Sequence, residues 1–549
     1  MIENKTFSDF TGGVNYTDPE LNMKEKYFVL ARNVELVYDS TIKKRNGFKL
    51  VKNLYSEMEE DEIINEIFYF QLHVVVVTNQ GRVLTVDDEG DVDVIFDSDI
   101  ATSQSTTIWS YPEARCFGAV GSGRLILSNG YDKPLQVNLS PDPGEDSCHY
   151  LLDPGTGSNA KVPVIYKACM VNHYMCCSVL GSNKIYVSAK NQIGVWADEN
   201  DISGVESTQE GACWIDVDQI VGIPNQNIVD LGSFKNLLCV VTEYHIVLIE
   251  LDTYTEATAW SDDENTNVTV RNHVPNVNIV IENAGGATVG SLQGTMRTLL
   301  FLSTNGLNEI ERNAVSQNFV PTSLSEKILP YVKTKLTSAV FENGVWSFVD
   351  KQKYTYGIKF ADNEMLCLSF HPNISEPCYW IWDNIKYKSF TNNVYGRLLA
   401  ADEYGIFIYA DDSEGVCEDS FIDNTGAEVK ETFTMEVTTP WLSFGRPNNV
   451  KTMDYINIIT DGNAKFTVKA ACDMVSDWQL DLDMVGGSMP GFGSGVNPFY
   501  GGGLITGTEQ LCEFPQVFMY AKFHFESTDN KPLRIIRYGA FYKTGGIRR

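Results

Sequence analysis

The sequence predicts an all-β fold: a β-propeller with an additional C-terminal antiparallel β-domain. Short runs rich in Val, Ile, Tyr, Phe and Trp are broken at close intervals by Gly, Asn and Asp, a pattern typical of strands joined by tight turns. One unit, an apolar run, a polar turn and a second apolar run, recurs along the chain, and long amphipathic helices are almost absent. Hairpins at this density without a strict period favour four-stranded blades arranged around an axis. Two stacked β-sandwiches would show the same alternation, and periodicity does not separate the two folds.

The order of the elements divides the chain into three parts. Residues 1–55 are expected to form an N-terminal entry segment that closes onto the propeller or onto an adaptor protein, and residues 56–430 to form the propeller. The clearest hairpin covers residues 72–86, where Asn79-Gln80-Gly81 supplies the turn chemistry. Hairpins of the same shape are expected near residues 118–138, 173–188, 228–251, 298–312, 339–360 and 398–409.

The C-terminal domain, residues 431–549, has longer strands with partial alternation. They are expected over residues 432–441, 451–459, 465–471, 516–526 and 533–541, and they indicate an antiparallel sheet with one solvated face.

A glycine-rich loop, residues 486–503, interrupts this domain. Long loops inside compact domains are usually functional or disordered. The loop carries the apolar side chains of Met489, Phe492, Phe499 and Tyr500, so we interpret it as a candidate gate or partner-contact loop.

The charge balance is unusually acidic. The 549 residues include 42 Lys and Arg against 72 Asp and Glu, which gives a formal net charge of −30 at pH 7. No basic tract occurs. Wrapping of DNA by phosphate neutralisation is therefore excluded, because that mode needs clustered Lys and Arg. An acidic surface facing DNA would repel it.

The lack of a visible secretory signal and the scattered cysteines lead us to expect a protein made in a cytoplasm. The N-terminus is polar, and the longest apolar runs fall far short of the ~20 residues that a membrane helix needs. The twelve cysteines show no compact spacing, so we interpret them as reduced thiols, with an oxidised framework as the alternative. Adjacent Cys176 and Cys177 would point to opposite faces of a strand, one in the core and one partly exposed.

Motifs for catalysis or metal binding are not found. The seven histidines have no zinc-ligand spacing, and neither a nucleophile elbow nor a phosphate-binding loop occurs. The acidic stretch 87–99 does not fit an EF-hand, so a solvated hairpin tip is expected, with another kind of calcium site left open. We therefore expect no enzymatic activity and no cofactor.

The first 50 residues carry a denser pattern. Gly12-Gly13-Val14-Asn15 is followed by Ala31-Arg32-Asn33-Val34 and then by Arg45-Asn46-Gly47. The order indicates a glycine turn, a short helical or irregular stretch, a strand, a turn and a basic residue before Gly-Phe. This pattern resembles the entry segment of the nozzle proteins of short-tailed bacteriophages, also called tail tubular protein B or packaged-DNA stabilisation proteins. The candidate interface residues are Gly12, Gly13, Asn15, Asn33, Arg45 and Gly47.

Later parts of the chain are similar to the same family and keep its order. They are residues 183–188 with Trp196, 301–307, 439–442 followed by Pro447, and 538–546. The glycine-rich loop and the acidic hairpin match nothing in that pattern.

The resemblance implies a structural virion protein, assembled in the host cytoplasm and located in the tail. It implies a homo-hexamer around a channel at the end of the tail, docked on a tail adaptor ring and contacted by tail fibres or a distal plug. Packaged double-stranded DNA would pass through the lumen without specific binding, and no membrane span is expected. Since each chain is strongly acidic, the lumen is expected to be acidic and to repel DNA.

Two other functions stay open on the sequence alone. An intracellular propeller scaffold that binds peptides would be monomeric. A glycan-binding or carbohydrate-active propeller is the other alternative, because the paired carboxylates of a glycosidase meet in space and not in sequence.

Overall fold

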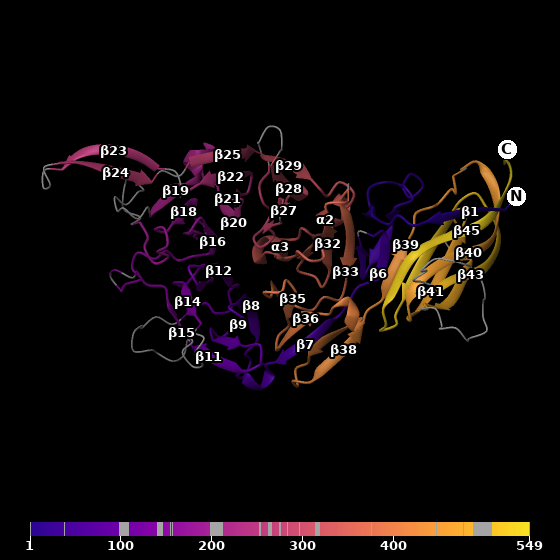
Figure 1. Cartoon of the computed structure of the whole chain (residues 1–549), viewed down its shortest axis with the longest axis horizontal. Helices are drawn as coiled ribbons and strands as arrows, with labels where there is room; N and C mark the ends of the chain where they lie inside the picture. Colours follow the sequence, from indigo (N-terminus) through magenta and orange to yellow (C-terminus); the bar gives the residue numbers. More distant parts are fainter. Residues whose placement is uncertain are drawn as a thin grey trace.

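The computed structural model describes residues 2–37, 39–97, 109–139, 147–153, 155, 157–197, 212–251, 254–261, 266–273, 276–282, 284–295, 297–312, 319–374, 376–445, 447–475, 477–486 and 508–547. Figure 1 shows a ring of small sheets around a central axis, joined on one side to a second β-domain that holds both ends of the chain.

Seven four-stranded antiparallel units form the ring in the described part of the chain. Blade 1 is β8 (Ile64–Phe70), β9 (His73–Thr78), β10 (Val83–Val86) and β11 (Val92–Phe96); blade 2 is β12 (Phe117–Gly121), β13 (Arg124–Ser128), β14 (Leu135–Asn138) and β15 (Ser147–Tyr150); blade 3 is β16 (Lys167–Val171), β17 (Tyr174–Ser178), β18 (Lys184–Val187) and β19 (Cys213–Asp216). Blade 4 is β20 (Ile228–Phe234), β21 (Leu237–Thr242), β22 (His245–Glu250) and β25 (Asn276–Glu282); blade 5 is β26 (Gln293–Gly294), β27 (Thr298–Ser303), β28 (Gly306–Arg312) and β29 (Phe319–Ser323). Blade 6 is β30 (Trp346–Asp350), β31 (Thr355–Lys359), β32 (Met365–Ser369) and β33 (Cys378–Trp382); blade 7 is β34 (Ser389–Asn392), β35 (Leu398–Ala401), β36 (Gly405–Tyr409) and β7 (Phe48–Asn53).

The first strand of each blade lies innermost, next to the axis of the ring. Strands β8, β12, β16, β20, β26, β30 and β34 contact one another in that order, and β34 returns to contact β8. The ring is therefore closed, which makes the fold a seven-bladed β-propeller with a further β-domain. The predicted hairpin over residues 72–86 is confirmed, with Val83 opposite Val77 across the turn.

The last blade is completed by an N-terminal strand. Strand β7 precedes blade 1 in the chain but pairs with β36 as the outer strand of blade 7. First and last blades are thus joined through one segment of chain, which holds the ring shut and gives β36 a partner along its open edge.

Both faces of a blade are buried, because each blade lies between two neighbours. On β17, Cys176 packs toward blade 4 and Cys177 toward blade 2, and neither side chain is exposed. The expectation that one of the two thiols is partly exposed is wrong for this reason. All eleven cysteines whose side chains are described are free thiols, and nine of them are buried.

Helices are short and lie in the connections between blades. They are α1 (Val217–Val221), α2 (Leu329–Lys335) and α3 (Ser338–Asn343), with 3-10 turns η1 (Tyr55–Glu57) and η2 (Asp412–Glu414). The hairpin predicted over residues 339–360 is wrong in its first part, where α3 precedes β30 and is followed by Gly344, whose φ of +79° is one that glycine adopts readily. A helix this short has no apolar periodicity to reveal it.

The second domain consists of two sheets packed face to face, not of one sheet with a solvated face. One sheet has the order β43 (Thr508–Phe518), β40 (Asn449–Gly462), β45 (Leu533–Ile547), β6 (Thr41–Lys44) and β5 (Val34–Val37), with β1 (Ile2–Phe7) also paired to β45. The other continues blade 6 outward from β33 through β4 (Leu30–Arg32), β39 (Met435–Thr438), β44 (Ala521–Ser527), β41 (Lys465–Cys472) and β42 (Leu480–Val485). Their inner faces share one apolar core, which includes Ile456, Tyr538, Phe523 and Val468.

The N-terminal 55 residues are therefore shared between both domains. Strands β1, β4, β5 and β6 belong to the sandwich, and β7 belongs to the propeller. Two further pairs complete the junction: β2 (Gly13–Val14) with β3 (Tyr27–Phe28), and β37 (Glu418–Ile422) with β38 (Glu428–Thr432).

A two-stranded hairpin, β23 (Tyr254–Ser261) and β24 (Thr266–His273), projects from blade 4 at the upper left of Figure 1. It is inserted between β22 and β25, which pair directly with each other. The hairpin is therefore an addition to a complete blade.

Candidate functional site

The six candidate interface residues lie within the folded chain, where the propeller meets the sandwich, and all of them except the half-buried Gly12 are buried. Gly13 has a φ of +68°, and a Cβ atom there would lie 2.3 Å from the backbone nitrogen of Tyr379 on β33. A Cβ atom on Gly47 would lie 1.7 Å from the carbonyl oxygen of Glu418 on β37. Gly12 is similarly close to Lys26. These glycines are required because two backbones meet at each of them.

The two asparagines fix the turns between the strands. The Asn15 side chain accepts the backbone N–H groups of Thr17 and Asp18 at 3.0 Å each. Asn33 has a φ of +52° and is fully buried. Its amide nitrogen donates to the Asp383 carboxylate and, at 2.8 Å, to the Thr434 carbonyl. Asn33 thus connects β4 to the segments that follow β33 and β38.

Arg45 makes the central ion pair of the junction. Its guanidinium binds both carboxylate oxygens of Asp419, at 3.0 and 2.6 Å, and its Nε donates to Asn33 Oδ1 at 3.1 Å. The guanidinium also lies 3.5 Å from the centre of the Phe433 ring. Both charged side chains are fully buried, and Asp419 further accepts the Phe48 N–H at 3.1 Å. Such a bidentate pair fixes orientation as well as distance.

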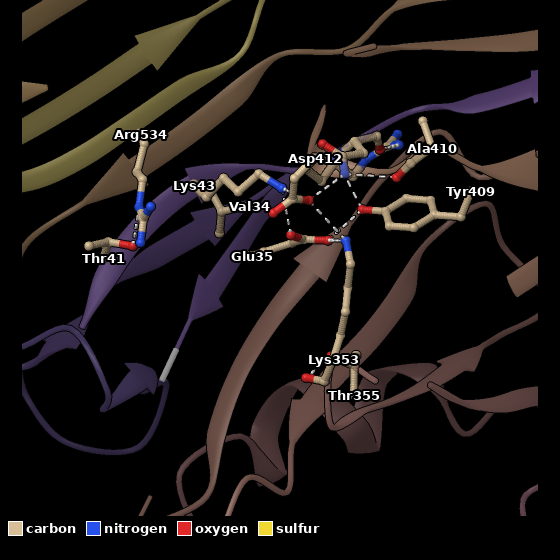
Figure 2. A network of polar contacts seen from close by, with 12 residues as sticks. Val34, Glu35, Thr41, Lys43, Lys353, Thr355, Tyr409, Ala410, Asp412 and Arg534 are labelled. Atoms are coloured by element: carbon tan, nitrogen blue, oxygen red, sulfur yellow. Dashed lines mark hydrogen bonds and ion pairs between the residues drawn. The ribbon is translucent and has the colours of Figure 1, made fainter. Parts of the chain in front are cut away.

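A second cluster brings together the sandwich, blade 6 and blade 7 (Figure 2). Glu35 on β5 accepts from Lys353 at 2.9 Å, from Lys43 on β6 at 3.2 Å and from the Tyr409 hydroxyl at 2.7 Å. Asp412 on η2 bonds to Lys43 and accepts from Asn46 at 2.8 Å. We call Glu35, Lys43, Lys353, Tyr409 and Asp412 the junction cluster.

The electrostatics of the junction cluster favour its charged state. Burial raises the pKa of Glu35, but Lys353 and Lys43 outweigh burial and lower that pKa from 4.5 to about 2. Burial lowers the pKa of Lys353, whereas Glu35 and Asp412 raise it to a net value above the usual range. At neutral pH the cluster is therefore an ionised network that resists separation of the domains.

The contacts of Arg45 and of the junction cluster connect parts of the fold to one another. The charged groups are saturated by one another, and the described residues include no group of three or more His, Cys, Asp or Glu placed to hold a metal ion. Sequence reasoning identified Arg45 but missed its partner Asp419 and the cluster around Glu35. Asp419 lies 374 residues from Arg45, and Lys353 and Tyr409 lie 318 and 374 residues from Glu35, so no local pattern marks these contacts.

The candidate gate residues Met489, Phe492, Phe499 and Tyr500 lie outside the described residues, of which Gly486 is the last before that loop. The acidic stretch is described from Asp87 to Asp97. Its tip is an exposed turn between β10 and β11, where Asp87 accepts the N–H groups of Glu89 and Asp91 at 3.0 and 2.8 Å. Asp99 lies outside the described residues.

A hollow of about 370 Å³ lies between blades 5 and 6. Arg297, Glu309, Glu311 and His371 line it together with Phe370. Burial, with the neighbouring Glu311 adding to it, raises the pKa of Glu309.

None of the described helices is long and apolar enough to cross a bilayer. Comparison of the sequence with models of known families and with characterised proteins gives no match. Solved structures similar to the chain include the β-propeller domain of Cps50 (Swd1) from Myceliophteria thermophila, at 8% identity and a TM-score of 0.38, covering 66% of this chain and 100% of that one. Streptogramin B lyase matches at 13% identity and a TM-score of 0.36, covering 66% and 97% of the two chains. U3-55K matches at 7% identity and a TM-score of 0.36, covering 66% and 98%.

Proposed function

We propose that this chain is a structural subunit of the tail nozzle of a short-tailed bacteriophage, part of the channel that retains packaged DNA and releases it. The observation that carries the proposal is the position of the residues that resemble the nozzle family. Gly13, Asn33, Arg45 and Gly47 come from one N-terminal segment and hold the propeller and the sandwich together. A pattern tied to the joint between two domains supports a shared architecture better than scattered surface matches would.

Rigidity of that joint suits a protein under mechanical load. The buried Arg45–Asp419 pair and the ionised junction cluster oppose a change in the angle between the domains. A ring that contains DNA under pressure needs subunits that do not bend at such a joint. The charge of −30 fits a channel from which DNA must slide without adhering, because carboxylates repel phosphates.

In this proposal six copies assemble on a tail adaptor ring, tail fibres or a distal plug contact the assembly, and the mature protein is located in the virion. The test is electron microscopy of the purified protein, alone and mixed with the portal and adaptor of the same virus. Six-fold rings at the tail end are expected. In parallel, particles assembled without this protein are expected to lose their DNA.

Two results would rule the proposal out: no ring or tail-end density in any mixture, and full DNA retention in particles lacking the protein. A strictly monomeric protein that captures defined peptides would support the scaffold function instead. Specific binding on a glycan array would support the glycan-binding one.

A further inference from the structure

The hollow of about 370 Å³ between blades 5 and 6 opens at one end of the ring. Neighbouring strands of a blade are antiparallel, so the first and third turns of both blades lie at that end. Arg297 in the first turn of blade 5, Tyr354 in the first turn of blade 6 and Pro372 in the third turn of blade 6 line the hollow. Arg297 and Pro372 are exposed, so a ligand can enter from solvent.

Two glutamates of β28 line this hollow without a cationic partner. Glu309 and Glu311 are two positions apart on the strand, so both side chains point to the same face. Burial, with Glu311 adding to it, raises the pKa of Glu309, and no cation among the described residues lowers that pKa. Within the same part of the chain, Arg297 makes no ion pair with either glutamate. The half-buried Glu364, in contrast, is paired with Lys335.

Aromatic side chains form another wall of the hollow. The ring centre of Tyr354 lies 5.8 Å from that of Phe370 and 4.7 Å from that of His371, both in edge contact. The Tyr354 carbonyl accepts the Phe370 N–H at 2.9 Å, and His371 Nδ1 accepts the Asn373 N–H at 3.2 Å. Tyr354 has a φ of +52°, which is uncommon for an aromatic residue. The backbone therefore holds these rings at the hollow in one arrangement.

Leucine side chains provide an apolar floor. Leu300, Leu324 and Leu368 line the hollow and belong to the core that blades 5 and 6 share. A bare metal ion would not suit such a floor, because hard cations need oxygen ligands on several sides. An organic cation on an apolar stem suits the whole lining, since carboxylates and aromatic rings attract its charge and leucines cover its methylene groups.

We infer that the hollow between blades 5 and 6 binds the side chain of an arginine, with the guanidinium at Glu309 and Glu311 and the methylene stem on the leucine floor. A guanidinium is favoured over an ammonium because it is planar, pairs with carboxylates through two hydrogen bonds and stacks on aromatic rings. Arg297, as a like charge at the mouth of the hollow, opposes the ligand. This site does not depend on the nozzle function.

Three small probes and the full chain test the binding. N-acetyl-arginine methylamide carries the side chain without charged ends. Its citrulline counterpart has nearly the same shape but a neutral urea group, and its lysine counterpart has an ammonium. Calorimetry and saturation-transfer NMR are expected to show binding of the arginine probe. The citrulline probe is expected to bind at least about tenfold more weakly, because it makes no charge-assisted hydrogen bonds. The lysine probe is expected to bind with intermediate affinity.

Four variants assign the contact. Glu309→Gln and Glu311→Gln keep the shape of the side chains, and each is expected to weaken binding of the arginine probe by at least about tenfold. Arg297→Gln is expected to strengthen it, because a like charge is removed. Glu513→Gln removes an exposed carboxylate from β43 of the sandwich and is expected to leave the affinity unchanged. Thermal melting establishes that all four variants are folded.

Acid is expected to weaken binding. A bound guanidinium favours the ionised form of Glu309, so the affinity falls as the pH is lowered through the titration of this carboxyl. Glu311 adds to the same effect, whereas His371 on the opposite wall can take up a proton and repel the ligand. Glu376, which also lines the hollow, is already held by Lys26 at 3.2 Å and by Tyr27. Glu309→Gln is therefore expected to reduce the pH dependence.

A peptide distinguishes the two sources of the guanidinium. A short peptide with one arginine between leucines is compared with the single-residue probe. At least about tenfold tighter binding of the peptide would assign the site to an arginine of a partner protein, and equal binding would assign it to a free guanidinium compound.

The inference is overturned if the arginine probe does not bind, if the citrulline probe binds equally well, or if both glutamate variants bind like the wild type. Weaker binding by Arg297→Gln would also overturn it, since the hollow would then select an anion. Each of these results leaves the nozzle proposal standing, and the absence of tail-end rings would leave this binding site standing.

Discussion

Arg45 is the residue on which the joint between the domains depends most directly. Its guanidinium is fully buried against Asp419, Asn33 and Phe433. Arg45→Ala leaves the Asp419 carboxylate buried without its partner, so we expect the free energy of unfolding to fall by about 3–5 kcal/mol. Arg45→Lys is expected to recover only part of this loss, because an ammonium cannot make the bidentate contact. Urea unfolding measures both.

Lys49→Ala is the matched control for Arg45. Lys49 pairs with Glu414 at the surface, and an exposed pair contributes roughly 0–1 kcal/mol. Equal losses for Arg45→Ala and Lys49→Ala would show that the buried pair does not hold the joint.

Glu35 makes the free energy of unfolding depend on pH in the acidic range. Its folded pKa of about 2 is below its unfolded value of 4.5, so it stabilises the fold above pH 4.5, and this contribution is lost as the pH falls toward 2. The shift corresponds to about 3 kcal/mol. Glu35→Gln is expected to destabilise the protein at pH 7 and to flatten the decline in stability between pH 5 and about 2.

The measurement is the urea midpoint at pH 7, 5 and 3 for wild type and Glu35→Gln. Asp461→Asn, a change at a partly exposed carboxylate on β40 of the sandwich, serves as the control for the loss of a carboxylate outside the junction cluster. Parallel pH profiles for wild type and Glu35→Gln would contradict the assignment of the acid-induced loss of stability to Glu35.

At the scale of the element, the β23–β24 hairpin is separable from its blade. Strands β22 and β25 pair with each other without it, from His245 opposite Glu282 to Glu250 opposite Asn276. Replacing residues 252–275 by a short Asn-Gly turn is expected to change stability by less than about 1 kcal/mol, because the ladder of blade 4 is kept.

Thermal melting checks this replacement. Ile281→Ala on β25, a buried position, is the comparison and should cost about 2–5 kcal/mol through the cavity it leaves. Melting of the shortened protein far below the wild type would mean that the hairpin supports the blade.

The elements that could be predicted from the sequence are those marked by local turn residues. The hairpin at residues 72–86 was predictable because Asn79-Gln80-Gly81 lies between two Val-rich runs, and turn and strands agree. Helix α3 was not, since a few residues carry no periodicity. The expectation that one thiol of the Cys176–Cys177 pair is partly exposed is wrong, because strand alternation shows that the two side chains point to different faces but does not show that neighbouring blades bury both faces.

At the scale of the whole molecule, long-range pairing limited the prediction. The closed ring of first strands decides between a propeller and two sandwiches, and no stretch of sequence contains that closure. The pairing of Arg45 with Asp419 spans 374 residues and that of Ile2 with Lys543 nearly the whole chain. Of the residues at the junction, the sequence singled out the glycines, Asn15, Asn33 and Arg45 as candidate interface residues, but none of the acidic partners that they meet inside the chain.

The pairing of β1 with β45 has a consequence for synthesis. The first strand leaves the ribosome hundreds of residues before its partner exists, and β7 likewise waits for β36. Contacts this distant in sequence close slowly. The blades between them can form as they emerge, yet the ring and the sandwich can be completed only after the last strand is released. A nascent chain that lacks the last strands therefore cannot complete either the ring of blades or the sandwich.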